Sequence, residues 1–388
     1  MKVLLLSPLA GIDPANGDVT YTQELLERPP AGVEYVDYAD ALARGDLLER
    51  GRPSELARRQ GLAKAGPVVR AIVAKPLDTA RRRELLFREP LRFFEVRPGA
   101  FDLVHTHVFS VGYRGNWPPI VTSNSVSVDA LYGDGLGWDA RKVARSVAVE
   151  RGLARALRVD HSTYHRVRSA RLLAFTQHLK DWWVARGVAD TADIDVVPCT
   201  VARQLLRTLK STPRVVGFFA GSPEIKGLDR AFRAFEALRA GQPDVELHVI
   251  GAAGPTPAWA HVAAAPGVTW VGRRDRAELL SEVLPQLDVL VHPTRFDGLP
   301  LSVLEAMSVG VPVITSDYRA LPEVVGDSRL VAVTATELTE ALVRSLHPGT
   351  NHDLSTRAQE RHRTAYSPEA VSPLLWACYL RAVTALAG

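Results

Sequence analysis

Short apolar runs alternate with longer segments of helical period along almost the whole chain, a pattern typical of strands joined by helices over a parallel sheet. In the first half the pattern predicts strands at residues 2–8, 32–38, 101–107, 119–124, 172–176 and 194–198. It restarts after the midpoint and predicts strands at residues 214–221, 245–251, 268–272, 287–293, 311–315 and 328–333. We therefore expect two separate doubly wound α/β units.

Three further segments complete the expected organisation. Residues 140–168 have the pattern of one long helix. Residues 200–212 hold no strand-like run, so we expect a linker or hinge between the two units there. Residues 369–388 predict a terminal helix, because Leu375, Tyr379 and Val383 lie four apart along one side.

Length and composition agree with this organisation. The 388 residues exceed what one hydrophobic core usually supports, which favours two domains. The two cysteines, Cys199 and Cys378, exclude a disulfide framework and a four-cysteine metal site. The apolar run at the N-terminus has only a strand's length, and no stretch approaches a membrane span, so we expect a cytoplasmic protein.

The charge of the chain is modestly basic, with a net +4, and 40 of its 47 basic residues are arginines. This arginine-rich, lysine-poor composition suggests a GC-rich bacterial genome. No arginine cluster is interleaved with aromatic residues as in a nucleic-acid-binding module, so we expect no nucleic acid. Residues 81–96 are rich in arginine and phenylalanine; they fit a membrane-surface or acceptor-binding element, or, as we favour, a solvated helix on the sheet.

The stretch FDGLPLSVLEAM, residues 296–307, places Asp297 in a turn after a strand and Glu305 inside the following helix. Ligands of open parallel sheets bind beyond the carboxyl ends of the strands, where this turn lies. A helix N-terminus favours phosphate, and a carboxylate can accept hydrogen bonds from vicinal hydroxyls, so the spacing suits a nucleotide sugar. The alternative is that Asp297 only caps the helix.

The motifs around this stretch resemble a known family. HPTRFDGLPLSVLEAMSVGVPVITSD is similar to the donor-site signature of the retaining GT-B glycosyltransferases of family 4, also called glycosyl transferases group 1. The pattern is an acid, seven residues, a glutamate, then Ala-Met and Gly-x-Pro-Val. FFAGSPEIKGLDRAFRAFEAL resembles the family's lysine-glycine phosphate loop, and the likeness covers nearly all of residues 214–328.

The resemblance implies a GT-B fold, in which two Rossmann-like domains face each other across a cleft. We place the acceptor-binding domain at residues 1–205 and the donor-binding domain at residues 206–368. The terminal helix, residues 369–388, is then expected to return to the N-terminal domain. The resemblance also implies a metal-independent reaction without a cofactor, with a UDP- or GDP-type nucleotide sugar as donor.

Carried over to this chain, the motifs imply catalytic roles for Lys226, Asp297 and Gly17. Lys226, the only lysine after residue 210, binds the donor diphosphate, and Gly17 brings backbone amides to it from the opposite domain. Alternatively, Lys226 is a surface lysine and Gly17 a turn residue. The full set of implied donor-binding residues is Ser222, Lys226, Arg273, Asp297, Gly298, Leu299, Pro300 and Glu305, with Glu305 on the ribose hydroxyls and Asp297 on the transferred sugar.

The chain departs from the family pattern at three places. Asp297 replaces the usual first glutamate and is one methylene shorter. Ser222 lies in the region where an arginine usually precedes the phosphate lysine, so the missing charge must come from Arg295 or Arg273 or be absent. Asn124 stands where a histidine near the transferred sugar is expected.

Asp18, His107 and Asn124 are the candidate acceptor-binding residues in the N-terminal domain. His105 and His107 alternate on a strand, and His161 and His165 lie four apart on the expected helix. Neither pair has a third ligand at a fitting spacing, so we expect structural histidines and no metal site.

These observations predict a hexosyltransferase-type enzyme that moves a sugar to a hydroxyl of a small-molecule or lipid-linked acceptor. Contact with a membrane surface is compatible with a lipid-linked acceptor but is not favoured. A nucleotide-sugar epimerase is disfavoured because its site lacks this signature. The departures at Asp297, Ser222 and Asn124 keep open a noncatalytic GT-B subunit that binds nucleotide sugar or activates a partner.

Overall fold

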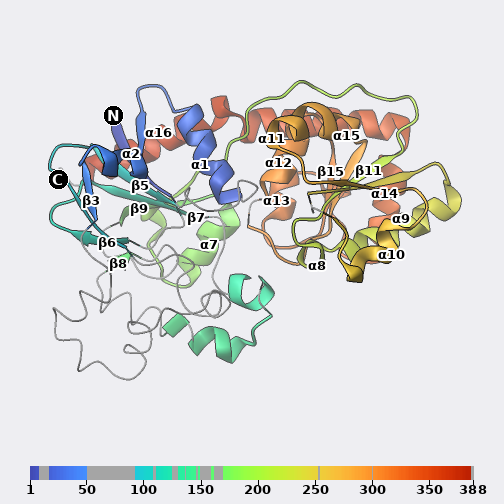
Figure 1. The fold of residues 1–388 in the computed structure, drawn as a ribbon, viewed down its shortest axis with the longest axis horizontal. Coiled ribbons are helices and arrows are strands. Elements are labelled where there is room, and N and C mark those ends of the chain that lie inside the picture. Colours follow the sequence, from blue (N-terminus) through green and yellow to red (C-terminus); the bar gives the residue numbers. More distant parts are fainter. Residues whose placement is uncertain are drawn as a thin grey trace.

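Two all-parallel sheets, one in each half of the chain, form the two domains of the protein (Figure 1). The computed structural model describes residues 1–7, 17–49, 92–107, 111–124, 130–135, 137–145, 147–148, 159–160, 169–251, 254–298 and 300–385. The first sheet has the order β10-β9-β7-β5-β1-β2, and its strands are β1 (Lys2–Leu6), β2 (Glu34–Asp37), β5 (Leu103–His107), β7 (Ile120–Asn124), β9 (Ser169–Ala174) and β10 (Ile194–Val196). The second has the order β13-β12-β11-β14-β15, with β11 (Val215–Phe219), β12 (Glu246–Ile250), β13 (Val268–Gly272), β14 (Val289–His292) and β15 (Val313–Thr315).

Helices cover both faces of these sheets, which explains why the strands read as continuous apolar runs. The first domain carries α1 (Gly17–Glu27), α2 (Tyr38–Ala43), α7 (Gln177–Ala185) and α16 (Pro368–Thr384). The second carries α8 (Pro223–Lys226), α9 (Leu228–Gly241), α10 (Ala260–Ala263), α11 (Arg276–Glu278), α12 (Leu301–Ser308), α13 (Leu321–Val325), α14 (Ala335–Ser345) and α15 (Pro348–Ala365). In β1, for example, Val3 to Leu6 are all fully buried, as expected of a strand covered on two faces.

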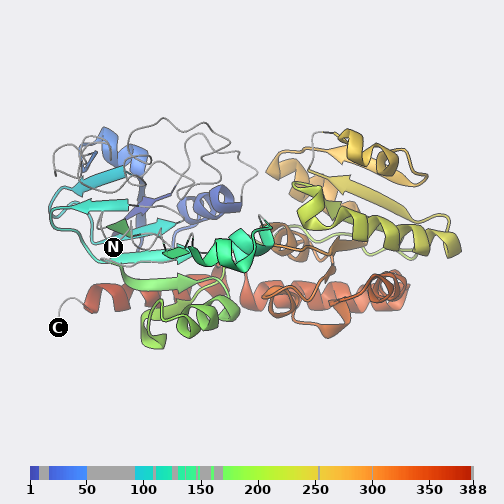
Figure 2. The same cartoon turned by 90° about the horizontal axis from the view of Figure 1, so that it is seen from below.

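The terminal helix is present as expected and packs against the first sheet. Leu375 and Tyr379 are buried on its inner side, and the helix contacts β5, β7 and β9. Figure 2 shows α15 and α16 following one another along the same side of the second and the first domain. The hydroxyl of Tyr379 lies 2.7 Å from that of Tyr35 on β2, and Arg381 pairs with Asp195 at 2.6 Å. The last helix of the chain therefore belongs to the core of the first domain.

A small third sheet corrects two of the helix predictions. It has the order β3-β4-β6-β8 and is formed by β3 (Leu47–Glu49), β4 (Arg92–Val96), β6 (Val111–Arg114) and β8 (Val159–Asp160). Residues 140–145 are helical, but residues 159–160 pair with β6, so one long helix over 140–168 is wrong. A helix through 92–96 is also wrong, because Phe94 and Val96 alternate into the core that includes Leu4. Residues 81–91, His161 and His165 lie outside the described residues.

The strand predicted at residues 328–333 is a third correction. Ser328–Leu330 form a 3₁₀ turn, and only Val331 makes a bridge, to Thr315 on β15. The side chain of Asp327 accepts a hydrogen bond from the backbone N–H of Arg329 at 3.0 Å, which favours a turn over an extended strand.

The predicted linker lacks helix and strand, as expected, but its second half is fixed to the second domain. Arg207 is buried and donates hydrogen bonds to the carbonyl of Gly310 at 3.0 Å, to Asp288 at 3.2 Å and to Asn351 at 2.6 Å. Asp288 also accepts from the backbone N–H of Val215 at 2.9 Å. A hinge within residues 200–212 is therefore confined to the part before Arg207.

Within the described residues, no helix combines the length and the apolar character needed to cross a lipid bilayer.

Replacing Asp288 with asparagine is expected to destabilise the protein by about 3 kcal/mol, because it leaves the buried Arg207 guanidinium without its counter-charge. Urea unfolding measures the change. Asp353→Asn is the matched control, since Asp353 is 45% exposed in its ion pair with Arg329 and should lose far less stability. Equal losses in the two variants would contradict the structural role of the Arg207–Asp288 pair.

Candidate functional site

The candidate residues of the second domain lie at the point where its sheet changes direction. β12 and β13 extend the sheet on one side of β11, and β14 and β15 extend it on the other. Lys226 follows β11 through α8, and Asp297 follows β14. Ligands of open α/β sheets bind at this switch point, beyond the carboxyl ends of the strands. The fold therefore brings these two residues to one location from 71 residues apart in the chain.

Gly227 allows α8 to lie against the end of β14. It separates α8 from α9 and has a φ of 83°, in the left-handed region that favours glycine. A Cβ atom at this position would stand 2.3 Å from the carbonyl oxygen of Pro293. The lysine-glycine pair thus places Lys226 by backbone geometry, because only glycine permits so close an approach.

Asp297 is the centre of a charged cluster. It pairs with the ammonium of Lys226, lies 3.0 Å from Nε2 of His292, and accepts a hydrogen bond from the N–H of Gly298 at 2.9 Å. Burial alone raises the pKa of Asp297, but Lys226 and His292 outweigh it and hold this pKa well below its usual range. The residue at the cap of α12 is Pro300, so the alternative that Asp297 caps this helix is wrong.

Glu305 is buried within α12 and is bound to a different cation. Oε1 of Glu305 accepts a hydrogen bond from Nε of Arg276, at the start of α11, at 2.8 Å. Burial raises the pKa of Glu305, and the Arg276 guanidinium offsets only part of this rise. The second carboxylate of the motif therefore lies beside Arg276 and outside the Lys226–Asp297 pair.

The remaining donor-site candidates lie around these two carboxylates. Ser222 is the exposed N-cap residue of α8, and Arg273 is exposed directly after β13. Gly298 and Pro300 lie between Asp297 and α12, while Leu299 is outside the described residues.

Arg295, one of the arginines considered for the additional phosphate charge, is paired with a carboxylate of its own domain. Its two terminal nitrogens lie 2.8 and 2.7 Å from the carboxylate oxygens of Asp229, so a phosphate at Arg295 would share this guanidinium with Asp229.

The candidates of the first domain gather at the equivalent switch point of its own sheet. The sheet changes direction between β1 and β5, with Gly17 and Asp18 opening α1 after β1 and His107 ending β5. Nε2 of His107 lies 3.3 Å from the carboxylate of Asp18. Asn124, at the end of β7, is buried two strands from β1. Gly17 approaches Leu301 of α12, since a Cβ atom on Gly17 would be 3.7 Å from Leu301 Cδ1.

The paired histidines of β5 belong to a buried hydrogen-bond chain. Ser123 Oγ lies 2.8 Å from Nδ1 of His107 and 2.9 Å from Nε2 of His105, and Nδ1 of His105 lies 2.6 Å from the Tyr379 hydroxyl. Burial, followed by the neighbouring His107, lowers the pKa of His105 to about 3. Among the described residues, no group of three or more His, Cys, Asp and Glu side chains is arranged to hold a metal ion.

Sequence reasoning missed several charged or polar residues near the candidates. His292 is hidden inside an apolar strand, and Arg276 and Glu24 have no motif that marks them.

A second missed group joins the domains beyond β15, where Asp134 accepts hydrogen bonds from Tyr318 at 2.7 Å and from Arg319 at 2.8 Å. Arg319 has a φ of 50°, an uncommon conformation for a residue with a side chain.

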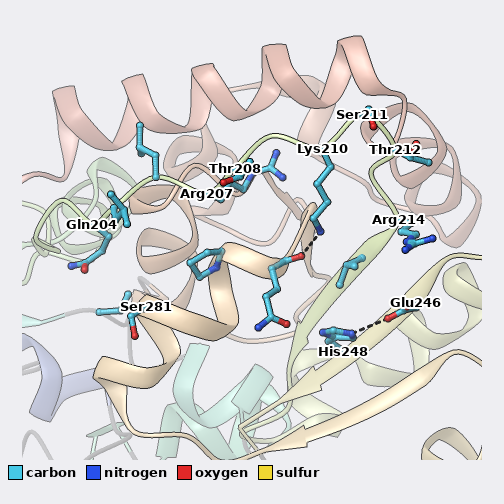
Figure 3. Close-up of a pocket in the computed structure, with 16 residues that line it drawn as sticks. Gln204, Arg207, Thr208, Lys210, Ser211, Thr212, Arg214, Glu246, His248 and Ser281 are labelled. Atoms are coloured by element: carbon cyan, nitrogen blue, oxygen red, sulfur yellow. Dashed lines mark hydrogen bonds and ion pairs between the residues drawn. The ribbon is translucent and has the colours of Figure 1, made fainter.

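A pocket of about 910 Å³ lies elsewhere, at the opposite edge of the second sheet (Figure 3). It is lined by the linker and by residues near the starts of β11 and β12, including Lys210, Arg214 and His248. His248 is 3.2 Å from Glu246, and Lys210 donates to the carbonyl of Gln286 at 2.6 Å. Because ligands of such sheets bind at the carboxyl edge, we place the functional site at the Lys226–Asp297 cluster and not in this pocket.

Comparison with known proteins matches the part of the chain that holds these residues. The family model described as glycosyl transferases group 1 matches residues 213–347, which include both Lys226 and Asp297. This domain belongs to the glycosyl transferases group 1. The MMP alpha-(1->4)-mannosyltransferase of Mycolicibacterium hassiacum is 28% identical over 205 residues, which is 50% of each chain. The chain spans about half the length of that curated relative, and less of the others.

Solved structures extend the likeness to the whole fold. The sucrose-phosphate synthase from Thermosynechococcus elongatus has a TM-score of 0.64 at 16% identity and covers 99% of both chains. The apo form of the lipopolysaccharide outer core galactosyltransferase WaaB has a TM-score of 0.57 at 14% identity, covering 98% of this chain and 99% of that one. The group 1 domain is therefore part of a GT-B fold, as the sequence predicted.

Replacing His105 with glutamine is expected to make stability less dependent on pH. In the unfolded chain His105 takes up a proton near pH 6.5, whereas in the folded protein it stays neutral down to about pH 3. The unfolded state thus binds more protons over this interval, so stability falls as pH drops, by up to about 1.4 kcal/mol per pH unit. Urea unfolding between about pH 7 and 4.5 should show the stability difference between wild type and variant shrinking as pH falls.

His352→Gln is the control, because His352 lies on α15 outside the buried chain. A constant difference between wild type and His105→Gln across the pH range would contradict this assignment.

Proposed function

We propose that the protein is a retaining glycosyltransferase that moves a hexosyl group from a nucleotide-diphosphate sugar to an acceptor hydroxyl. The observation that carries the proposal is the pairing of Lys226 with Asp297 at the switch point of a group 1 domain. The names of the compared mannosyl- and galactosyltransferases support a sugar-transfer reaction.

The nucleotide sugar is proposed to lie along the carboxyl edge of the second sheet. Its diphosphate binds Lys226, its ribose hydroxyls donate to Glu305, and its sugar lies at Asp297 and the backbone of Gly298. The approach of Gly17 to Leu301 brings the N-termini of α1 and α12 together, so backbone amides of both domains can meet the phosphates.

Catalysis in this proposal is electrostatic stabilisation of the leaving diphosphate. Lys226 and the helix N-termini take up the negative charge that develops as the glycosidic bond breaks. The acceptor hydroxyl attacks from the same face, and its proton passes to the leaving phosphate. The acceptor itself lies at the first domain, near Asp18, His107 and Asn124, and is a small molecule or a lipid-linked sugar.

The site is proposed to work without a metal ion or a cofactor, because Lys226 and the backbone amides supply the positive charge at the diphosphate. A noncatalytic subunit is the second candidate, and the observation that favours it is that Arg295, considered as the source of the additional phosphate-binding charge, is paired with Asp229.

We expect UDP or GDP to stabilise the protein against thermal unfolding in the presence of EDTA, by about 2.7 kcal/mol at 100 times Kd. Lys226→Ala and Glu305→Gln should abolish most of this stabilisation, because they remove the phosphate and ribose contacts. Arg233→Ala, a change at a 68% exposed cation on α9, should retain it. Stabilisation that appears only with added metal, or that survives both site variants, would contradict the proposed donor site.

Turnover of UDP- and GDP-hexoses, followed as release of nucleoside diphosphate, tests the reaction. Lys226→Ala is expected to lower the rate by about 10²–10³-fold, as loss of one stabilising donor does in other enzymes. Arg233→Ala again serves as the control. Near-normal turnover by Lys226→Ala would rule out the role of this lysine, whereas a wild-type protein that binds nucleotide but turns over no donor would favour the noncatalytic candidate.

A further inference from the structure

Arg276 lies between two buried carboxylates that come from different domains. Its Nε atom donates to Oε1 of Glu305 on α12 at 2.8 Å, and its Nη2 atom lies 2.6 Å from Oε1 of Glu24 on α1. The side chains of Glu24 and Glu305 are 1% and 8% exposed, and that of Arg276 is 28% exposed. One guanidinium therefore connects the second carboxylate of the donor motif to the opposite domain.

The buried carboxylate of Glu24 contacts two cations. Its Oε2 atom accepts a hydrogen bond from Arg28, one turn later on α1, at 2.7 Å. Its Oε1 atom faces Arg276 as an ion pair at 2.6 Å. Because a buried, unpaired charge is strongly destabilising, this contact favours the arrangement in which α1 and α11 stay together.

The same contact acts on Glu305. In the proposed function Glu305 is the ribose clamp, the carboxylate that accepts hydrogen bonds from the two ribose hydroxyls. To do so it must be ionised and held in one orientation. Burial opposes ionisation, and the hydrogen bond from Arg276 supports it. Arg276 in turn is held by Glu24, so the first domain contributes to the state of a carboxylate on the second.

We propose that Glu24 and Arg276 are positioning residues for the ribose clamp, so that the nucleotide binds tightly only when the two domains are docked through this bridge. The inference rests on the proposed function, since it assumes that Glu305 binds ribose. Linkage then requires the reciprocal effect, in which a bound nucleotide strengthens the docking of α1 against α11.

Calorimetric titration of UDP and GDP tests the bridge in a double-mutant cycle of Glu24→Gln and Arg276→Lys. Each single variant is expected to weaken binding of the preferred nucleotide by about 10- to 150-fold, the range of a hydrogen bond to a charged group. The double variant should lose less than the product of the two, because both act through one contact. Glu27→Gln, on the same helix but 59% exposed, is the control and should bind as the wild type does.

Two further measurements separate positioning from a general structural effect. The losses should vanish with the 2′,3′-dideoxy nucleotides, which lack the hydroxyls that Glu305 binds. In Arg276→Lys, whose cation cannot reproduce the Nε contact, the affinity should also begin to fall at a higher pH than in the wild type. The reason is that Glu305, no longer supported by Arg276 and still facing the Glu24–Arg28 pair of α1, is protonated earlier as pH decreases.

Equal affinities of Glu24→Gln and Glu27→Gln would overturn the inference. Tighter binding by Glu24→Gln would also overturn it, because the bridge would then compete with ribose. Losses of affinity that persist with the dideoxy nucleotides would also overturn it, because they would show a general structural effect that does not act through the ribose hydroxyls. A wild-type protein that binds neither UDP nor GDP would instead overturn the proposed function, and the inference with it.

Discussion

The direction in which each parallel sheet is wound is the constraint on which the arrangement of this protein depends. Each sheet is extended first to one side of its first strand and then to the other, so β1 and β11 each stand at a switch point. In a parallel sheet the loops that follow the carboxyl ends of the strands all lie at the same edge. At a switch point two neighbouring loops run in opposite directions and leave a space for a ligand. Gly17 and Lys226 follow the two first strands, and the contact of Gly17 with Leu301 shows that the two edges face each other.

The charged side chains at the carboxyl edge of the second sheet are paired with one another, and this pairing affects how an anionic ligand can bind. Asp297 is held by Lys226 and His292, and Glu305 by Arg276. An anionic ligand that binds Lys226 must therefore share this ammonium with the carboxylate of Asp297. That carboxylate is also stabilised by His292 and by the backbone N–H of Gly298. This arrangement keeps buried charges paired while the site is empty, and in the proposed function it lets the diphosphate and Asp297 divide one cation between them.

The two domains are joined by chain crossings that lie side by side. The N–H of Val201 and the hydroxyl of Thr200 both donate to the carbonyl of Tyr366 at 3.1 Å, where α15 gives way to α16. Beyond them, Arg207 fixes the linker to the second domain, and Tyr379 fixes the last helix to the first. The crossings connect the domains through the backbone, and the bridge from Glu24 to Arg276 connects them a second time through side chains.

By itself the sequence determined the class of fold, eleven of the twelve predicted strands and the local motif that holds Asp297 and Glu305, because apolar runs and short motifs are local properties of the chain. It could not reveal the small sheet, since Phe94 and Val96 become a strand only against the core around Leu4. Only the tertiary structure decided that Asp297 meets Lys226 and His292, and that Arg276 links Glu305 to Glu24. Such pairings are made between distant segments, and they are selected because a buried charge left without its partner is strongly destabilising, which no local pattern records.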